Sequence, residues 1–417
     1  MAGGKTFFYI ASLYDPVTGL GPSDIAMDAC EVTGAASAPA LSCGQPVIVG
    51  TSTQCQKIKI SKTRFIKFCS FTDKEYVAVD PARGKLYVSY SDFVLRSGSG
   101  GDPELMSVCD LGTRAGGRGP AGGTPAAPLC EHGTPLVPAG KNFLVGRPYF
   151  TVAPTDPHGC ENEGSYPAVD IATGSVYVGY EYNWATNLGF PSCEGSDTPI
   201  ENVLTVTPAK CLLLRAVSPC AGPAAAAGVP IVSLDGTFVP GYNRFPTSDF
   251  PRLAVSDKFR TVSMVWNDTR VHPLGDILLQ SFRLKSLRPV QSRPVMLDRP
   301  HNGGLDMFPA LRTANSDGLL DVSWYSRASV ATSVTSVLAA IGVSPRATAT
   351  PGNIAITNVA SDWDHDSSLI VPNFGDYIDA SVGVTGSWPY VGGTLYIAWS
   401  DGRLGIPQPF SAHLPAG

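Results

Sequence analysis

Residues 75–92 read EYVAVDPARGKLYVSYSD, two runs of β-forming residues joined by a short polar segment. Within each run, apolar and polar side chains alternate, which is the pattern of a strand with one buried face. Between the runs, Asp80, Pro81 and Gly84 supply the backbone conformations that tight turns require. The stretch therefore predicts a β-hairpin.

The second strand of this hairpin recurs along the chain. Six copies start 58 to 90 residues apart, at Phe8, Leu86, Val176, Val262, Leu320 and Leu395. Five copies carry a large aromatic ring at the same place, where we expect it to fill the space between neighbouring sheets: Tyr90, Tyr180, Trp266, Trp324 and Trp399. A first strand precedes five of the copies, and a third apolar strand follows each of them.

Three to four antiparallel strands per repeat, without a convincing amphipathic helix, favour a β-propeller over a sandwich or a solenoid. We expect an all-β fold in which residues 1–417 form a single propeller domain of six blades, each of about four antiparallel strands. Because the first strand is found only five times, the chain is expected to start within the first blade. The alternative is five full blades plus an N-terminal hairpin that caps or completes the last blade.

Composition restricts the possible partners. The 417 residues include 44 Gly and 36 Pro with 16% charged residues, which indicates a folded chain rich in turns. A formal charge of −5 without a run of Lys or Arg argues against nucleic acid as a partner. No stretch of consecutive apolar residues is long enough to span a membrane.

All ten cysteines lie between Cys30 and Cys220 and lack the spacing of zinc ligands, so we expect disulfides and an extracellular location, secreted or on the cell surface. No signal peptide is visible at the N-terminus, so a leader has been removed or the sequence starts inside a longer reading frame. Spacing leaves the connectivity open. The simplest choice is sequential pairing, which gives Cys30–Cys43, Cys55–Cys69, Cys109–Cys130, Cys160–Cys193 and Cys211–Cys220.

The segments DKEYVAVDPARGKLYVSYSDF (73–93), FGDYIDASV (374–382) and LYIAWSDGR (395–403) resemble the repeats of secreted bacterial sialidase-like propeller proteins. The resemblance implies an exo-glycosidase superfamily whose enzymes use an arginine triad, a Tyr nucleophile activated by Glu, and an Asp acid/base. The full aspartate-box turn of that family is absent from this chain. Isolated arginine candidates are Arg147, Arg252, Arg312 and Arg403, from which no triad is named.

An acidic residue precedes the first strand of five repeats. When these strands are aligned on a shared alanine (Ala78, Ala168, Ala254, Ala310 and Ala380), the acids lie four or five residues earlier, at Asp73, Glu163, Asp249, Asp306 and Asp376. First strands line the channel of a propeller, so the alignment predicts an acidic central funnel. The alternative is that each acid caps a turn by accepting hydrogen bonds from backbone N–H groups.

These residues suggest glycosidase chemistry, in which paired carboxylates act on a sugar. The predicted catalytic residues are Asp73, Asp249, Asp376 and the neighbouring Tyr377, and the predicted substrate-binding residues are Glu163, Asp306, Arg252 and Arg312. The sequence thus predicts an extracellular sialidase-like propeller that binds or hydrolyses glycans. The alternative is a non-catalytic propeller that binds an extracellular or cell-surface protein or builds a surface assembly.

Asp362, Asp364 and Asp366 alternate in the way that opens a calcium-binding loop. Ser367 and Asn373 replace the Gly and Glu that a standard loop requires at its sixth and twelfth positions. The segment is therefore interpreted as a solvated loop, with a non-standard surface Ca²⁺ site at these three aspartates as the alternative and Ca²⁺ as the one cofactor that the sequence suggests.

Overall fold

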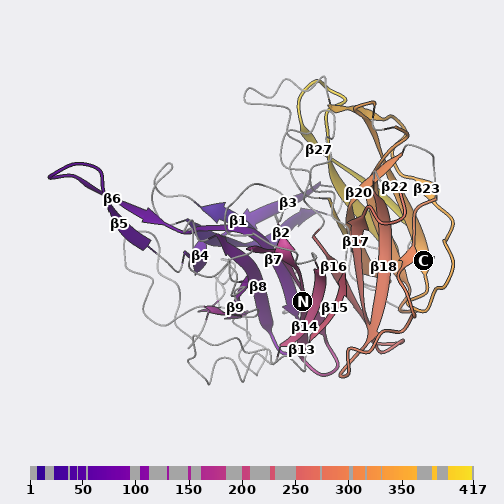
Figure 1. Ribbon diagram of the computed structural model, residues 1–417, viewed down its shortest axis with the longest axis horizontal. Coiled ribbons are helices and arrows are strands. Elements are labelled where there is room, and N and C mark those ends of the chain that lie inside the picture. Colours follow the sequence, from indigo (N-terminus) through magenta and orange to yellow (C-terminus); the bar gives the residue numbers. More distant parts are fainter. Residues whose placement is uncertain are drawn as a thin grey trace. The chain divides into compact units, whose positions relative to one another are not determined.

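A computed structural model of the chain describes residues 7–14, 23–35, 38–44, 46–52, 55–93, 104–111, 129–130, 149–151, 161–184, 200–206, 226–230, 250–272, 275–299, 304–314, 317–329, 331–363, 378–382 and 393–415 (Figure 1). The chain groups into two compact units. Unit 1 contains Met1–Val178 and Leu204–Ala224, and unit 2 contains Gly179–Val203 and Ala225–Gly417. The boundary falls inside two strands, and the prediction of a single domain over residues 1–417 stays a prediction.

The first part of the chain forms two larger sheets and a separate hairpin. One sheet has the order β1-β2-β3 with β4 paired to β2, from β1 (Phe7–Tyr14), β2 (Asp24–Ala35), β3 (Ala38–Cys43) and β4 (Val47–Thr51). The hairpin consists of β5 (Cys55–Lys59) and β6 (Phe65–Cys69). The next sheet has the order β10-β9-β8-β7 with β11 paired to β9, from β7 (Phe71–Asp80), β8 (Lys85–Phe93), β9 (Glu104–Asp110), β10 (Leu129–Cys130) and β11 (Tyr149–Thr151).

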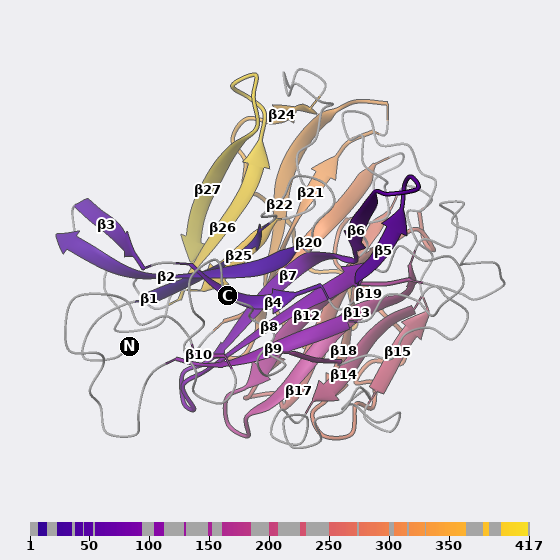
Figure 2. The ribbon, with the colours of Figure 1, turned by 90° about the vertical axis from the view of Figure 1, so that its left-hand side faces the viewer.

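The remaining sheets follow chain order. The third is β12 (Glu161–Asp170), β13 (Ser175–Trp184), β14 (Ile200–Val206) and β15 (Ala226–Pro230). The fourth is β16 (Arg252–Ser256), β17 (Thr261–Asp268), β18 (Asp276–Arg283) and β19 (Val295–Met296). The fifth is β20 (Leu305–Thr313), β21 (Leu320–Arg327), β22 (Val334–Val343) and β23 (Ile354–Ala355), with β24 (Ser361–Asp362) on β22. The last, yellow in Figure 2, is β25 (Asp379–Val382), β26 (Thr394–Asp401) and β27 (Gln408–Pro415).

This succession of antiparallel sheets confirms the prediction of an all-β propeller. The predicted number of six four-stranded blades is corrected: among the described residues, five sheets have four or more strands and the C-terminal sheet has three. The five-blade alternative is closer, but the N-terminal strands form a sheet of their own in place of its capping hairpin. No helix among the described residues is long and apolar enough to span a membrane.

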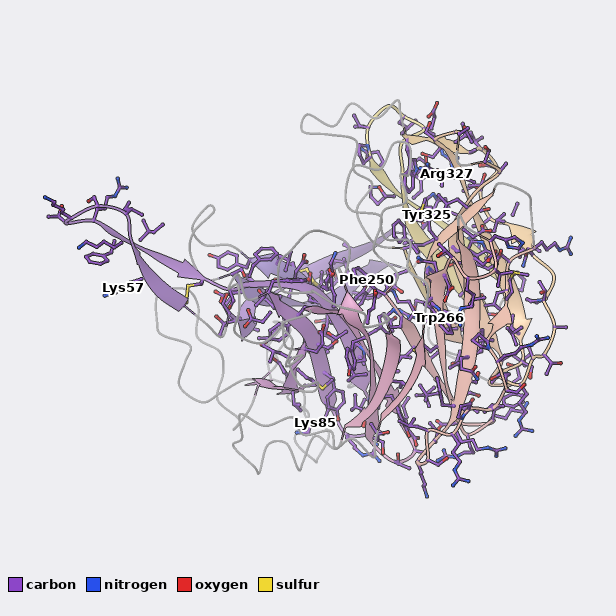
Figure 3. The ribbon with its side chains drawn as sticks, viewed as in Figure 1. Lys57, Lys85, Phe250, Trp266, Tyr325 and Arg327 are labelled. Carbon is purple, nitrogen blue, oxygen red and sulfur yellow. A yellow bond between two sulfur atoms is a disulfide. The ribbon has the colours of Figure 1, made fainter. Side chains whose placement is uncertain are left out.

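The core lies between successive sheets. In unit 1, residues from β2 and β4 pack on residues from β8 and β9, and in unit 2, residues from β17 and β18 pack on residues from β20 to β22. Central strands are therefore buried on both faces, as β17 and β21 show along their full length, whereas the outer strand β27 alternates in exposure. The aromatic residue of each repeat is buried as predicted: Tyr90, Tyr180, Trp266, Trp324 and Trp399 (Trp266 is labelled in Figure 3).

Local turn chemistry also follows the sequence. Asp80 Oδ1 accepts hydrogen bonds from the N–H groups of Ala82 and Arg83, both at 3.1 Å, and the turn ends at Gly84 with a φ of 60°. The next sheet repeats this turn with Asp170 and with Gly174, whose φ is 76°. Only glycine adopts such backbone angles without strain, so each Asp-to-Gly segment fixes its hairpin.

Two of the five predicted disulfides are confirmed, Cys30–Cys43 and Cys55–Cys69. Each joins residues that are directly paired in adjacent strands. Cys109 is disulfide-bonded as well, and its backbone pairs with that of Cys130. The other predicted bonds, Cys160–Cys193 and Cys211–Cys220, lie outside the described residues.

Candidate functional site

The described residues include part of the predicted site. Asp73 and Glu163 lie in unit 1, whereas Arg252, Asp306, Arg312 and Asp362 lie in unit 2. The predictions for Arg147, Asp249, Asp364, Asp366, Asp376 and Tyr377 fall outside the described residues. Within the described part of the chain, no three His, Cys, Asp or Glu side chains lie in an arrangement that holds a metal ion.

The strand register corrects the alignment on alanines. Ala310 pairs with Ser323, the residue directly before the aromatic residue of its repeat. Ala78 instead pairs with Tyr87, three residues before the aromatic residue of its own repeat. The two alanines are therefore two positions apart in the fold, and the acids counted back from them are not equivalent.

A β-bulge in both β7 and β20 gives the correct equivalence of these two strands. The register shifts between Asp73 and Tyr76 in β7 and between Met307 and Ala310 in β20. In this register Asp73 corresponds to Met307, and Asp306 lies one residue earlier. Since successive strand residues point to opposite faces, Asp306 belongs to the face opposite to that of Asp73.

Asp306 has a structural partner. Its Oδ1 accepts a hydrogen bond of 2.9 Å from Nε1 of Trp324, and the residue has no exposed surface. The same device recurs in β17 and β26, where Trp266 donates to Asp268 at 3.1 Å and Trp399 donates to Asp401 at 3.0 Å. A buried indole N–H requires such an acceptor, so these aspartates hold the blade tryptophans in place.

The described arginine candidates are bound by the protein itself. Arg252 is 2% exposed, and its Nη1 donates to the carbonyl oxygens of Phe250 and Pro251 at 3.2 and 3.4 Å. Arg312 Nη2 lies 2.7 and 2.9 Å from the two carboxylate oxygens of Asp379. Arg403 Nε donates to Asp401 at 3.0 Å. Each guanidinium thus already donates to acceptors of the protein.

Two predicted acids do lie in one neighbourhood, which joins the first strands of two successive sheets in unit 1. The Nζ atom of Lys74 lies 3.6 Å from Oε1 of Glu163, and the rings of Tyr76 and Tyr166 stand 4.7 Å apart between centroids. We call the group of Asp73, Lys74, Glu75 and Tyr76 from β7 with Glu163 and Tyr166 from β12 the β7–β12 cluster.

The β-bulge shapes the β7 side of this cluster. Lys74 is its first residue, with a φ of 59°, and Asp73 Oδ1 accepts a hydrogen bond of 2.7 Å from the Lys74 N–H. The Lys74 and Glu163 side chains are only 6% and 3% exposed, so they form a buried ion pair whose partners depend on one another. Asp73 and Glu75 are partly exposed and give the cluster its accessible polar surface, whereas Tyr76 is partly exposed but its hydroxyl oxygen is buried.

Charge and burial tune the carboxyl groups here. Burial raises the pKa of Glu75 above its ordinary value, and the nearby negative charge of Asp73 raises it further, against its backbone hydrogen bond and the charge of Lys74. Deeper in the sheet, Glu104 of β9 is fully buried and accepts hydrogen bonds of 2.9 and 3.1 Å from the Ser91 hydroxyl. Burial raises the pKa of Glu104 to about 7.

Unit 2 holds a second group of carboxyls, around Asp298. Burial, followed by the charges of Asp306 and Asp276, raises the pKa of Asp298 to about 9. Asp298 is 1% exposed and accepts a hydrogen bond of 2.8 Å from the Ile277 N–H, while Asp276 lies 2.6 Å from Nδ1 of His272. These carboxyls are buried and have little surface to offer a ligand.

Sequence reasoning missed Lys74 and Glu104. Lys74 lies beside a predicted acid, but its pairing with Glu163 spans 89 residues and depends on the bulge. Glu104 could have been predicted from the sequence, because it is a single acid at the start of an otherwise apolar strand (ELMSVC). Burying such an acid costs free energy unless it is hydrogen-bonded.

No family model matches the chain, and no curated protein matches it. Among solved structures, the chain is similar to a Hadza microbial sialidase, Hz136, with a TM-score of 0.47 and 10% identity over 99% of this chain and 64% of that one. A Trypanosoma rangeli sialidase in complex with sialic acid gives 0.42 and 10% over 99% and 52%. An N-acetylgalactosamine deacetylase from F. plautii gives 0.39 and 11% over 79% and 80%. The chain spans under two thirds of both sialidases, and the likeness is one of fold.

Proposed function

We propose that this chain is an extracellular propeller that binds glycans at the β7–β12 cluster. The observation that carries the proposal is the meeting of two first strands, through Lys74 with Glu163 and Tyr76 with Tyr166, in a place where carboxyl groups and a tyrosine remain accessible. Carboxylates accept hydrogen bonds from sugar hydroxyls, and an aromatic ring offers an apolar face to a sugar.

The same residues supply acid–base chemistry. Because its pKa is raised, Glu75 holds a proton at higher pH than a free glutamic acid does, and it lies two residues from Asp73 in the same bulge. A carboxyl group that keeps its proton and a second carboxyl group beside it are the kind of pair that glycoside cleavage uses. Hydrolysis at this pair is therefore part of the proposal.

Binding is tested by titrating the full chain with a panel of sialylated and neutral oligosaccharides. Asp73→Asn keeps the shape of the side chain and removes its charge, so we expect affinity to fall about tenfold or more, as for a lost charge-assisted hydrogen bond. Asp257→Asn is the matched control, because Asp257 is an exposed acid in unit 2. Equal affinities for wild type and Asp73→Asn would remove the assignment.

Turnover is tested separately with fluorogenic glycosides. Glu75→Gln is expected to abolish cleavage at a site of this kind while circular dichroism stays unchanged. The predicted roles of Asp249, Asp376 and Tyr377 enter the same assay, through Asp249→Ala, Asp376→Ala and Tyr377→Phe. The Ca²⁺ site proposed at Asp362, Asp364 and Asp366 is tested by measuring the melting temperature with Ca²⁺ and with a chelator.

The alternative function, a non-catalytic module for an extracellular protein partner, is favoured by one observation. The described arginine candidates all donate to protein acceptors, so part of the hydrogen-bonding capacity that an acidic sugar needs is already used. Binding of no glycan in the panel, together with capture of a defined extracellular protein, would replace the glycan proposal with this one.

A further inference from the structure

The hairpin of β5 and β6 is separate from every larger sheet. Its two strands pair only with one another among the described strands, and in Figure 1 it extends away from the neighbouring strand β4 of the same unit. The loop is closed by Ile60 and Ser61, whose N–H groups donate to the carbonyl oxygen of Arg64 at 3.0 and 3.2 Å. At the other end, the Cys55–Cys69 disulfide joins the strands.

Positive charge is concentrated in this hairpin, which we call the cationic hairpin (residues 55–69, CQKIKISKTRFIKFC). It contains five of the 30 Lys and Arg residues of the chain and none of the 35 Asp and Glu residues, so the remainder of the chain has a formal charge of −10. Among the described residues, no carboxylate lies within ion-pair distance of Lys57, Lys59, Lys62 or Arg64. The hairpin therefore presents its charge to solvent (Lys57 is labelled in Figure 3).

The cationic hairpin is also amphipathic. Its register pairs Lys57 with Lys67, Lys59 with Phe65 and Ile58 with Ile66. Alternation along the strands therefore places the lysine positions and Phe65 on one face and the isoleucine positions on the other. Near the tip, Ile60 and Phe65 are 48% and 56% exposed. Lys59 adds a link between the two kinds of group, because its Nζ lies 5.9 Å from the centre of the Phe65 ring.

We propose that the cationic hairpin docks the protein on the surface of an anionic lipid bilayer. The Lys and Arg side chains contact phosphate headgroups, and the apolar side chains enter the interface between headgroups and acyl chains. An anionic bilayer can bind the positive charges and the exposed apolar side chains at the same time. A hydrated polyanion, such as a sulfated glycan or a nucleic acid, would use the charge and leave the exposed isoleucine and phenylalanine without a partner.

The length of the hairpin makes docking compatible with an acidic protein. Its five-residue strands reach about 17 Å at about 3.4 Å per residue, whereas the Debye length is about 8 Å at physiological ionic strength. The tip therefore reaches an anionic surface while salt screens the negative charge of the remainder of the chain.

Vesicle flotation with the full, oxidised chain tests the proposal. We expect the protein to float with vesicles of phosphatidylcholine containing about one quarter phosphatidylglycerol, but not with pure phosphatidylcholine. Because each basic residue near such a surface contributes about fivefold to partitioning, Lys57→Gln/Lys59→Gln/Arg64→Gln should lower the partition coefficient about 100-fold. The matched control Lys258→Gln/Lys285→Gln/Arg288→Gln removes three exposed charges from unit 2 and should change it less than about twofold.

A second variant separates lipid from other polyanions. Ile60→Ser/Phe65→Ser keeps all charges and should lower vesicle partitioning at least about tenfold, because the apolar contribution is lost. Circular dichroism and thiol titration confirm that each variant is folded and oxidised. The proposal is overturned if the wild-type protein does not float, or if both charge variants lose vesicle partitioning equally. It is also overturned if the Ile60→Ser/Phe65→Ser protein floats as well as wild type and binds heparin or duplex DNA more tightly than vesicles.

Discussion

Replacing Glu104 by Gln tests how burial acts on one carboxyl in the core of unit 1. Glu104 is fully buried, and burial raises its pKa from an ordinary 4.5 to about 7. Between these values the folded chain binds the proton that the unfolded chain has released. The stability that the protonated carboxyl provides is therefore complete below pH 4.5 and is lost as pH rises to about 7. A gap of this size corresponds to about 3 kcal/mol.

Glutamine has nearly the same shape and cannot ionise, so Glu104→Gln removes this loss. Its amide oxygen still accepts the hydrogen bond from the Ser91 hydroxyl. We expect the variant to be within about 1 kcal/mol of wild type near pH 4.5 and more stable than wild type, by up to about 3 kcal/mol, near pH 8. The quantity to compare is the difference between the two proteins, because other groups contribute to the pH dependence of both.

Urea unfolding at both pH values measures this difference. Far-UV circular dichroism follows the unfolding of the sheets. Parallel stability curves for the two proteins from about pH 4.5 to about pH 8 would refute the reasoning, because they would show that Glu104 does not titrate in this range.

Three further substitutions address other features. Asp298→Asn should stabilise unit 2 near pH 8 but not near pH 4, measured by tryptophan fluorescence, because burial holds the pKa of Asp298 at about 9 and its protonated form is lost as pH rises. Burial alone would raise the pKa of Asp401, but hydrogen bonds from Arg403 and Trp399 outweigh burial and lower the pKa. Asp401→Asn should therefore lower the free energy of unfolding by about 2 kcal/mol at pH 7. The loss should become smaller as pH falls through the folded-state pKa, as measured by thermal melts at pH 7 and below that pKa. Gly174→Ala should cost about 1–2 kcal/mol in thermal melts, since φ is 76° there and a Cβ would collide with the Arg83 side chain; an unchanged melting temperature would contradict the tight contact.

The features that could be predicted from the sequence are local. The segments from Asp80 to Gly84 and from Asp170 to Gly174 fix their hairpins within a few residues, and the Cys55–Cys69 bond joins neighbouring strands of one hairpin. The recurring aromatic residue was also predictable, because the strand that carries it is central in its sheet and is buried on both faces.

Long-range register could not be predicted. Ala78 and Ala310 lie two positions apart relative to the aromatic residue of their repeats, and nothing local in the sequence shows this. For that reason the alanine alignment gave Asp306 the position of Asp73, although Asp306 belongs to the opposite face of its strand. The number of complete blades was one too high for a related reason, because a repeated second strand does not ensure a full set of partners, and the sheet of β25–β27 has three strands.

The cationic hairpin has no run of consecutive basic residues that would reveal it in the sequence. A search for consecutive basic residues finds nothing in residues 55–69, because Lys57 and Lys59 are separated by isoleucine. Alternation is the signature of charge on one face of a strand, so the appropriate search has a period of two.

The bond between Cys55 and Cys69 has a consequence for anyone preparing this protein. Two isolated strands are only marginally stable in water, so the disulfide holds the cationic hairpin in one register, and without it the strands would sample several registers. Material made in a reducing cytosol and material exported through an oxidising compartment would have the same mass to within a few protons, yet would differ at this extremity. Batches should accordingly be compared by their free-thiol content before their behaviour at surfaces is interpreted.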